Sequence, residues 1–290
     1  MERKANIRQQ AFFLPAKSGQ RFCVWRAPAT GEALRGLILH APAFAEEMNK
    51  SRRMTALAAR AFALRGFGVL QVDLLGCGES SGDFGEATWD AWVDDLMVAS
   101  GWMREQSDSN FWLWGLRAGA LLASAAMHRL PGPTSMLLWQ PTVSGKQQLT
   151  QFLRVKFASE MLSRAAEGNG TSQLRDRLLG GEPLEVAGYT VSPALAAGLD
   201  SAVFSIDASR AANIAWLEVA SAARASLSPV GETQVQSLQA RGIAVTGRSV
   251  RGPGFWQTTE IEECPELIDA SLAVLEQEVV REVSRSAVLL

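Results

Sequence analysis

The sequence predicts an α/β fold in which one helical insertion interrupts a mostly parallel, doubly wound sheet. Short apolar runs alternate with amphipathic helical patterns through the first half of the 290 residues and again near the end. The alternation stops between residues 142 and 209. The length suits one principal core. We therefore expect residues 1–141 and 210–290 to form the core and residues 142–209 to form a helical cap.

The elements before the insertion follow from hydrophobic periodicity and from turn residues. Residues 10–14 and 21–27 flank a Lys-Ser-Gly-Gln turn, which predicts an antiparallel hairpin at the edge of the sheet. Further strands are expected at residues 36–40, 67–75, 111–114 and 135–140. Helices are expected from Asn49 or Ser51, either of which can serve as N-cap, to about residue 65, and at residues 88–105 and 118–129.

The insertion contains two helical patterns, at residues 148–166 and 173–179, separated by a Gly-Asn-Gly break. After it, the pattern predicts a strand at 214–219, a helix at 231–241, a strand at 243–250 and a terminal helix at about 261–284. The resumed alternation places these last elements in the same core as the first half.

A strand, a sharp turn and a helix follow one another directly around residue 117. The buried run that begins at Phe111 meets Gly115, turns through Leu116, Arg117 and Ala118, and leaves through Gly119 into an alanine- and leucine-rich helix. Small glycines at these two positions let a strand and a helix approach closely. We expect a tight elbow with Arg117 at its centre.

Composition excludes several classes of protein. A formal charge of −2 lacks the cationic excess of a nucleic-acid binder, and no run of roughly 20 apolar residues predicts a membrane span. The charged start lacks the pattern of a signal peptide, so we expect a cytoplasmic protein. The three cysteines and two histidines show no metal-ligand spacing. We therefore expect reduced thiols, no metal and no cofactor.

The order of these elements, with the loop from Asp73 to Ser80 and the elbow at Arg117, resembles the α/β-hydrolase superfamily over nearly the whole chain. Four segments also resemble the exosortase A system-associated hydrolases, type 2. They are residues 44–53, 114–117, 139–141 with 144–146, and 255–257. The resemblance implies an α/β-hydrolase fold and a bacterial cytoplasmic protein encoded beside exopolysaccharide and protein-sorting functions. It implies a hydrolase by fold and no specific reaction.

The catalytic positions of this superfamily can be tested one by one. The nucleophile position holds Arg117, whose guanidinium stays protonated and can neither attack a carbonyl nor be activated by a base. Glu218 suits the acid position, near the end of the expected strand at 214–219. Residues 251–258, where the histidine would follow the last strand, contain none. We therefore expect no Ser-His-Asp catalysis.

The elbow still offers groups that attract an anion. The backbone N–H of Ala118 follows the nucleophile position, and those of Ala43 or Phe44 belong to the loop after the first parallel strand. With Arg117 beside them, and Leu116 in the same turn, a carboxylate or phosphate suits the site. The alternative is structural: a buried Arg117 pairs internally with an acid such as Glu218.

Further residues are candidates for the same pocket. Glu47, Asn49 and Lys50 follow the loop at Phe44, on the sheet edge where α/β proteins bind ligands, although capping and solvated faces are the commoner roles for such residues. Gln140 ends a strand at that edge. Trp256 stands where the histidine is missing, and it either fills the core or stacks on a ligand.

Two functions remain open. The first is hydrolysis of an ester- or thioester-like anionic compound, in which Arg117 holds a developing anion and Glu218 or Glu47 activates water. The second is a non-catalytic pseudo-hydrolase that binds an anionic metabolite or a partner hydrolase. The absent serine and histidine favour the second function, and the fold resemblance favours the first.

Overall fold

An eight-stranded sheet runs through the centre of the molecule. The computed structural model describes residues 6–28, 33–162, 170–221 and 226–288, and within them the strand order is β1-β2-β4-β3-β5-β6-β9-β10. The β1–β2 and β2–β4 pairs are antiparallel, and the other neighbours are parallel. The strands are β1 (Ile7–Pro15), β2 (Gln20–Pro28), β3 (Gly36–Ala41), β4 (Phe67–Val72), β5 (Phe111–Leu116), β6 (Thr134–Trp139), β9 (Ala211–Ala220) and β10 (Val245–Arg251).

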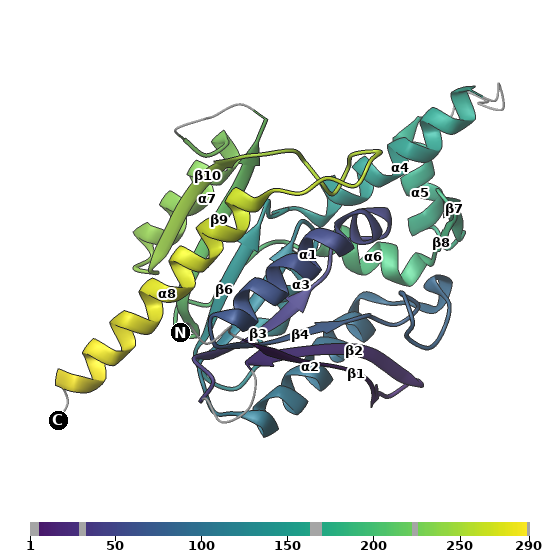
Figure 1. The fold of residues 1–290 in the computed structure, drawn as a ribbon. Helices are drawn as coiled ribbons and strands as arrows, with labels where there is room; N and C mark the ends of the chain where they lie inside the picture. Colours follow the sequence, from purple (N-terminus) through teal and green to yellow (C-terminus); the bar gives the residue numbers. More distant parts are fainter. Residues whose placement is uncertain (1–5, 29–32, 163–169, 222–225, 289–290) are drawn as a thin grey trace.

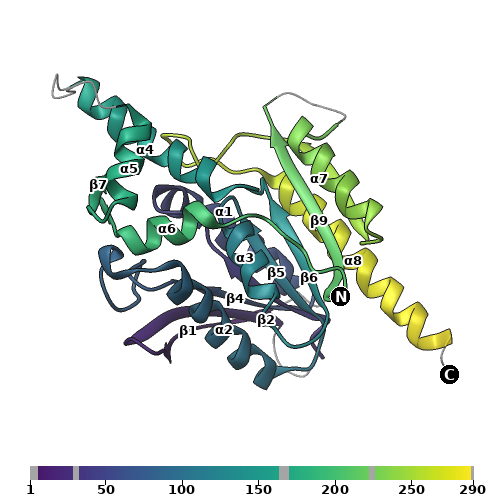
Figure 2. The ribbon, with the colours of Figure 1, turned by 180° about the vertical axis from the view of Figure 1, so that it is seen from behind.

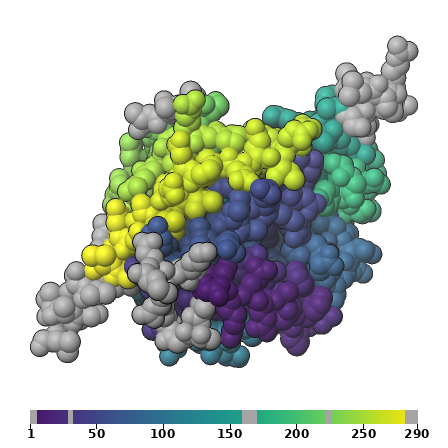
Figure 3. Space-filling model, in the orientation of Figure 1, coloured from purple at the N-terminus to yellow at the C-terminus, as the bar shows by residue number. Residues whose placement is uncertain are grey.

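Helices cover both faces of this sheet (Figure 1, Figure 2). On one face lie α1 (Glu46–Leu64) and α8 (Pro265–Val288), with the β1–β2 hairpin beside α1 (Figure 3). The other face is covered by α2 (Trp89–Gln106), which follows the short 3-10 helix η1 (Phe84–Glu86), and by α3 (Gly119–Met127) and α7 (Pro229–Ala240).

Cover on both faces explains the continuous apolar runs of the central strands. In β5, Trp112 and Trp114 pack in the core on the α1 side, whereas Phe111 and Leu113 pack in the core on the other side. Every residue of this strand is buried. The predicted α/β class with a mostly parallel, doubly wound sheet is confirmed.

The chain between β6 and β9 carries five elements. They are α4 (Gly145–Leu162), α5 (Thr171–Leu179), β7 (Leu184–Val186), β8 (Tyr189–Val191) and α6 (Pro193–Ser201), and β7 and β8 form a separate two-stranded sheet. Only the two helices α4 and α5 were expected from the sequence. Strands of three residues are too short to show a period of two. For α6 a signal was present, because Ser192 is its N-cap and Pro193 its first residue.

The predicted start of α1 was wrong. The helix begins at Glu46, before both Asn49 and Ser51, and its N-cap Ala45 makes no side-chain capping bond. Ala45 has a φ of 51°, so the chain turns sharply out of the loop after β3. The helix start is instead complemented by two acidic residues in its first turn, Glu46 and Glu47, which suit the positive end of the helix dipole.

In the described residues, no helix combines the length and the apolar character needed to cross a membrane.

Candidate functional site

The elbow between β5 and α3 brings Arg117 to the carboxyl edge of the sheet. Arg117 has a φ of 54°, in the left-handed region. Its N–H donates to the carbonyl of Trp139 at 3.0 Å, and its own carbonyl accepts from Thr142 N at 3.2 Å. A Cβ at Gly119 would overlap the carbonyl oxygen of Ala41, so this position requires glycine. The turn therefore keeps its strained shape although its central residue is an arginine.

A pocket of about 830 Å³ opens beside this elbow. It is bounded by the loop after β3, the first turns of α1 and α4, the ends of β9 and β10, and the segment after β10. Of its 22 lining residues, 14 are polar or charged. They are Glu46, Glu47, Lys50, Arg117, Gln140, Gln148, Gln151, Arg154, Glu218, Ser221, Ser226, Ser228, Ser249 and Gln257. The pocket therefore suits a hydrophilic ligand better than a long acyl chain.

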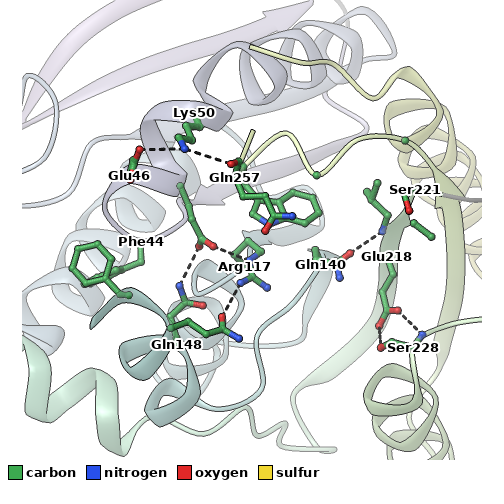
Figure 4. A pocket seen from close by; sticks show the side chains of 18 of the residues that line it. Phe44, Glu46, Lys50, Arg117, Gln140, Gln148, Glu218, Ser221, Ser228 and Gln257 are labelled. Atoms are coloured by element: carbon green, nitrogen blue, oxygen red, sulfur yellow. Dashed lines mark hydrogen bonds and ion pairs between the residues drawn. The ribbon is translucent and has the colours of Figure 1, made fainter. Parts of the chain in front are cut away.

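Arg117 is partly engaged by other side chains in this pocket (Figure 4). Its Nε donates to Glu47 Oε1 at 3.1 Å and its Nη2 donates to Gln151 Oε1 at 3.3 Å. The guanidinium carbon also lies 5.8 Å from the ring centre of Trp256, which is cation–π distance. The predicted internal pairing is therefore present, but the partner is Glu47. The described residues contain no ion pair between Arg117 and Glu218.

Glu47 lies between Arg117 and α4. Its Oε1 accepts from Arg117, and its Oε2 accepts from Gln148 Nε2 at 3.2 Å. Burial raises the pKa of this carboxyl above its ordinary value, although the charge and hydrogen bond of Arg117 oppose that rise. A carboxyl with a raised pKa beside a cation in a pocket is a candidate for proton transfer.

Glu218 lines the same pocket but is held by its own strand and by α7. Its carboxylate accepts from Trp216 Nε1 at 2.9 Å, from Ser228 Oγ at 2.9 Å and from Ser228 N at 2.6 Å. Ser228 is also the N-cap of α7, because its Oγ accepts from Gly231 N. Glu218, which the sequence predicts at the acid position, therefore helps to order the start of α7.

Gln140 and Trp256 also line the pocket. Gln140 has a φ of 44°, and its Oε1 accepts from Val219 N at 2.8 Å, which joins the ends of β6 and β9. Trp256 is 5% exposed and packs edge-on against Phe255. The Trp256 ring is mostly buried, and it also faces the Arg117 guanidinium.

Neither histidine of the chain lines this pocket. His40 points to the α1 side of the sheet, and His128 follows α3 at its far end, where Nε2 lies 3.2 Å from Ser205 Oγ. Cys77 is buried as well, and burial raises the pKa of its thiol to about 12. That thiol therefore stays protonated and unreactive at neutral pH.

The pocket brings most of the predicted side chains together. Phe44, Glu47, Lys50, Arg117, Gln140, Glu218 and Trp256 line it. The side chains of Ala43, Asn49, Leu116 and Ala118 do not: Leu116 is fully buried, and Asn49 Nδ2 donates to Tyr189 Oη at 2.7 Å. The contribution expected of Ala118 is its N–H, which finds no acceptor among the residues the structure describes.

The sequence did not predict that α4 forms one wall of the Arg117 pocket. Gln148, Gln151, Phe152 and Val155 line the pocket. Their spacing of three to four residues places them on one face of α4. That spacing was visible in the sequence, but no local signal showed which face of the helix would meet the pocket.

Comparison with known proteins gives the family. A family model described as serine aminopeptidase, S33 matches residues 44–216. The chain belongs to this family of α/β-hydrolases. The match begins at Phe44 in the loop after β3, includes the elbow and ends just before Glu218. Among curated proteins, none matches.

Solved structures of similar fold include an α/β serine hydrolase without lid from Xanthomonas campestris, with 16% identity, a TM-score of 0.53 and 94% of each chain covered. The protein Est1E from Butyrivibrio proteoclasticus has 10% identity and a TM-score of 0.57, with 93% of this chain and 99% of that chain covered. A serine hydrolase homologue from Coxiella burnetii has 14% identity and a TM-score of 0.51, with 94% and 96% covered. At these identities the likeness shows the fold alone.

Proposed function

We propose that this α/β-hydrolase-fold protein binds a small anionic ligand at Arg117 and performs no Ser-His-Asp catalysis. One observation carries the proposal. A guanidinium has five N–H donors, and the contacts with Glu47 and Gln151 use two of them. Three donors remain in the pocket, on a side chain that is 17% exposed. They can donate the paired, parallel hydrogen bonds that a carboxylate or phosphate accepts from a guanidinium.

The surrounding groups support an anion at this position. The free N–H of Ala118 follows Arg117, and together with the loop amides at Ala43 and Phe44 it belongs to the region that holds an oxyanion in a hydrolase. Arg154 stands at the pocket wall, exposed and without an ion-pair partner among the described residues. Its charge attracts an anion toward the pocket.

The lining also indicates the class of ligand. Serine hydroxyls and glutamine amides line the same pocket as Arg117, whereas Phe44, Phe152 and Val155 supply apolar surface. A hydrophilic carboxylate or a short acyl ester or thioester with an anionic group fits both features. The same chemistry is compatible with residues 142–209 acting as a cap, because α4 supplies Gln148, Gln151 and the apolar side chains of Phe152 and Val155.

A second function is favoured by Glu47. Its raised pKa and its contact with Arg117 suit a general base that takes a proton from water. The water oxygen would add to the acyl carbon, and Arg117 with the elbow amides would hold the oxyanion. Collapse would break the ester or thioester bond, and the leaving alkoxide or thiolate would take the proton back from Glu47.

Turnover and labelling distinguish the two functions. The purified protein is incubated with short aryl esters and acyl thioesters and, separately, with a serine-directed fluorophosphonate followed by intact-mass measurement. Binding without catalysis predicts no turnover and no mass increase. Turnover that Glu47→Gln abolishes would establish the second function instead. Labelling of a serine would show that both are wrong.

The biological setting is proposed from the resemblance to exosortase A system-associated hydrolases. Of the residues in the segments that carry this resemblance, those that line the pocket are Phe44, Glu46, Glu47, Lys50, Arg117, Gln140, Trp256 and Gln257. We propose a cytoplasmic role beside exopolysaccharide or protein-sorting functions, with a partner hydrolase as the alternative occupant of the site. Surface polysaccharide measured in a strain without this protein, complemented with wild type or Arg117→Gln, tests that role. Equal polysaccharide in all strains would contradict it.

A further inference from the structure

A second, smaller cavity lies on the α1 side of the sheet. Its volume is about 190 Å³, and its walls come from β2, β3, β4 and the middle of α1. It shares no lining residue with the Arg117 pocket. Val24, Gln71 and His40 form its floor, because they are neighbours across the three adjacent strands. The small side chains of Thr55 and Ala56 in α1 leave space above that row.

His40 in this floor lacks a hydrogen-bond partner. The residue is 6% exposed, and its Nε2 has no partner in the described protein. Burying an unsatisfied polar group is unfavourable, so such an atom in a native fold calls for a specific partner. The ring packs on Trp114 with 4.5 Å between ring centres, a contact that an apolar ring would make as well. Packing alone therefore does not explain a histidine here.

The charged groups around the cavity are unbalanced. Two guanidinium groups, from Arg26 and Arg52, line it, with Asp73 as the one carboxylate in the lining. Arg52 Nη1 lies 3.2 Å from Asp73 Oδ1, whereas Arg26 donates, among the residues that the structure describes, only to the neutral side chains of Gln9 and Gln71. Burial and the charge of Arg52 lower the pKa of His40 to about 3, so its ring stays neutral and keeps one N–H.

We propose that this cavity binds a small oxyanion, a carboxylate or a phosphate, through the guanidinium groups of Arg26 and Arg52, beside the ring of His40. The anion would balance the extra positive charge. The volume is sufficient, since it corresponds to roughly six water molecules at about 30 Å³ each. Arg26 is 9% exposed, so its charge is not screened by bulk water as a surface arginine would be.

Histidine NMR on the full chain tests the site directly. The sequence contains only two histidines, His40 and His128, so the ring ¹⁵N signals form two pairs. One pair comes from the cavity, and the other comes from a distant, exposed residue that serves as the control. Inorganic phosphate and acetate are titrated separately at pH 7 and constant ionic strength. We expect a saturable shift of the His40 signals with at least one anion and no matching shift of His128. No shift with either anion would overturn the proposal.

Neighbouring arginines of α1 provide a matched pair of variants. Arg52 lines the cavity, whereas Arg53 is more exposed, pairs with Glu263 and lies outside it. We expect Arg52→Gln to weaken anion binding roughly tenfold or more, the effect of one charge-assisted hydrogen bond. Arg53→Gln should leave it unchanged. Equal effects of the two variants would mean nonspecific attraction to the surface and would overturn the proposal.

Discussion

Arg117 changes what the elbow can do without changing its shape. The left-handed turn persists because backbone hydrogen bonds to Trp139 and Thr142 fix it from the adjacent strand and loop. A left-handed conformation costs a residue with a side chain roughly 1 to 2 kcal/mol. Its contacts with Glu47, Gln151 and Trp256 oppose that cost. The guanidinium thus lies at the elbow and lines the pocket.

The ion pair between Arg117 and Glu47 can be measured as a coupling energy. Arg117→Ala leaves the Glu47 carboxylate with Gln148 as its remaining hydrogen-bond donor. We expect a loss of about 1 to 3 kcal/mol in the free energy of unfolding. This is less than for a fully buried pair, because the two side chains are 17% and 20% exposed. Urea unfolding measures it.

The double variant Arg117→Ala/Glu47→Gln should recover part of the stability lost in Arg117→Ala, because a neutral amide replaces the stranded charge. Additive effects within about 0.5 kcal/mol would contradict the coupling.

The raised pKa of Glu47 also predicts how the stability of the protein changes with pH. Burial raises its pKa in the folded state, so the folded protein holds this proton at pH values where the unfolded chain has lost it. The stabilising contribution is present below the ordinary glutamate pKa of about 4.3 and is lost as pH rises through the raised folded value. We expect the free energy of unfolding of wild type relative to Glu47→Gln to fall across that window.

Urea unfolding of both proteins at a series of pH values measures this difference. A wild type that instead gained stability over Glu47→Gln in the same window would mean that Arg117 lowers the pKa of Glu47 more than burial raises it.

Among the secondary elements, the elbow requires glycine at position 119, where the backbone contact is shortest, and at position 115. A Cβ at Gly119 would overlap the backbone oxygen of Ala41, which cannot move aside without displacing β3. Gly119→Ala should therefore destabilise the protein by more than about 1 kcal/mol, the range of overpacked sites. Gly101 in α2 serves as the control, because a Cβ added there would have no atom within 4 Å.

Gly101→Ala should stabilise α2 by about 0.4 to 1 kcal/mol, because alanine has less freedom to lose on folding. Thermal or urea unfolding of both variants checks the pair. A Gly119→Ala protein as stable as wild type would show that the elbow is not packed against β3 as described.

Helix α1 lines both cavities, with residues of its first turns in one and residues nearer its middle in the other. Glu47 and Lys50 line the Arg117 pocket, whereas Arg52 and Thr55 line the smaller cavity. Asn49 links the same helix to the chain between β6 and β9 through Tyr189. Aromatic contacts reinforce that link, with ring centres of Phe44 and Phe152 5.1 Å apart. Any displacement of the proposed cap would therefore disturb the pocket wall.

At the scale of the whole molecule, the sequence was sufficient for the core of the fold. The central strands are buried on both faces, so they appear as dense apolar runs, and the intervening helices show a clear period. The region between β6 and β9 was predicted less well. The strands β7 and β8 have three residues each, and their pairing depends on tertiary packing against η1 and α4.

The sequence predicted at which edge of the sheet the site lies, but not which side chains pair with one another there. Topology gathers Arg117, Gln140 and Glu218 at the ends of neighbouring strands, so their place followed from the order of elements. The partner of Arg117 did not, because Glu47 reaches it from a helix whose start was misplaced. Gln148 and Gln151 were missed because side-chain direction depends on how α4 packs.

Calorimetric titration of wild type and Arg117→Gln tests the central claim most directly. The ligands are small hydrophilic anions that the pocket can hold: acetate, malate, D-glucuronate and acetyl phosphate. We predict saturable binding of at least one of them to wild type. We also predict that Arg117→Gln weakens this binding roughly tenfold or more, while urea unfolding shows that the variant remains folded. Equal affinity of wild type and a folded Arg117→Gln would contradict an anion site at Arg117.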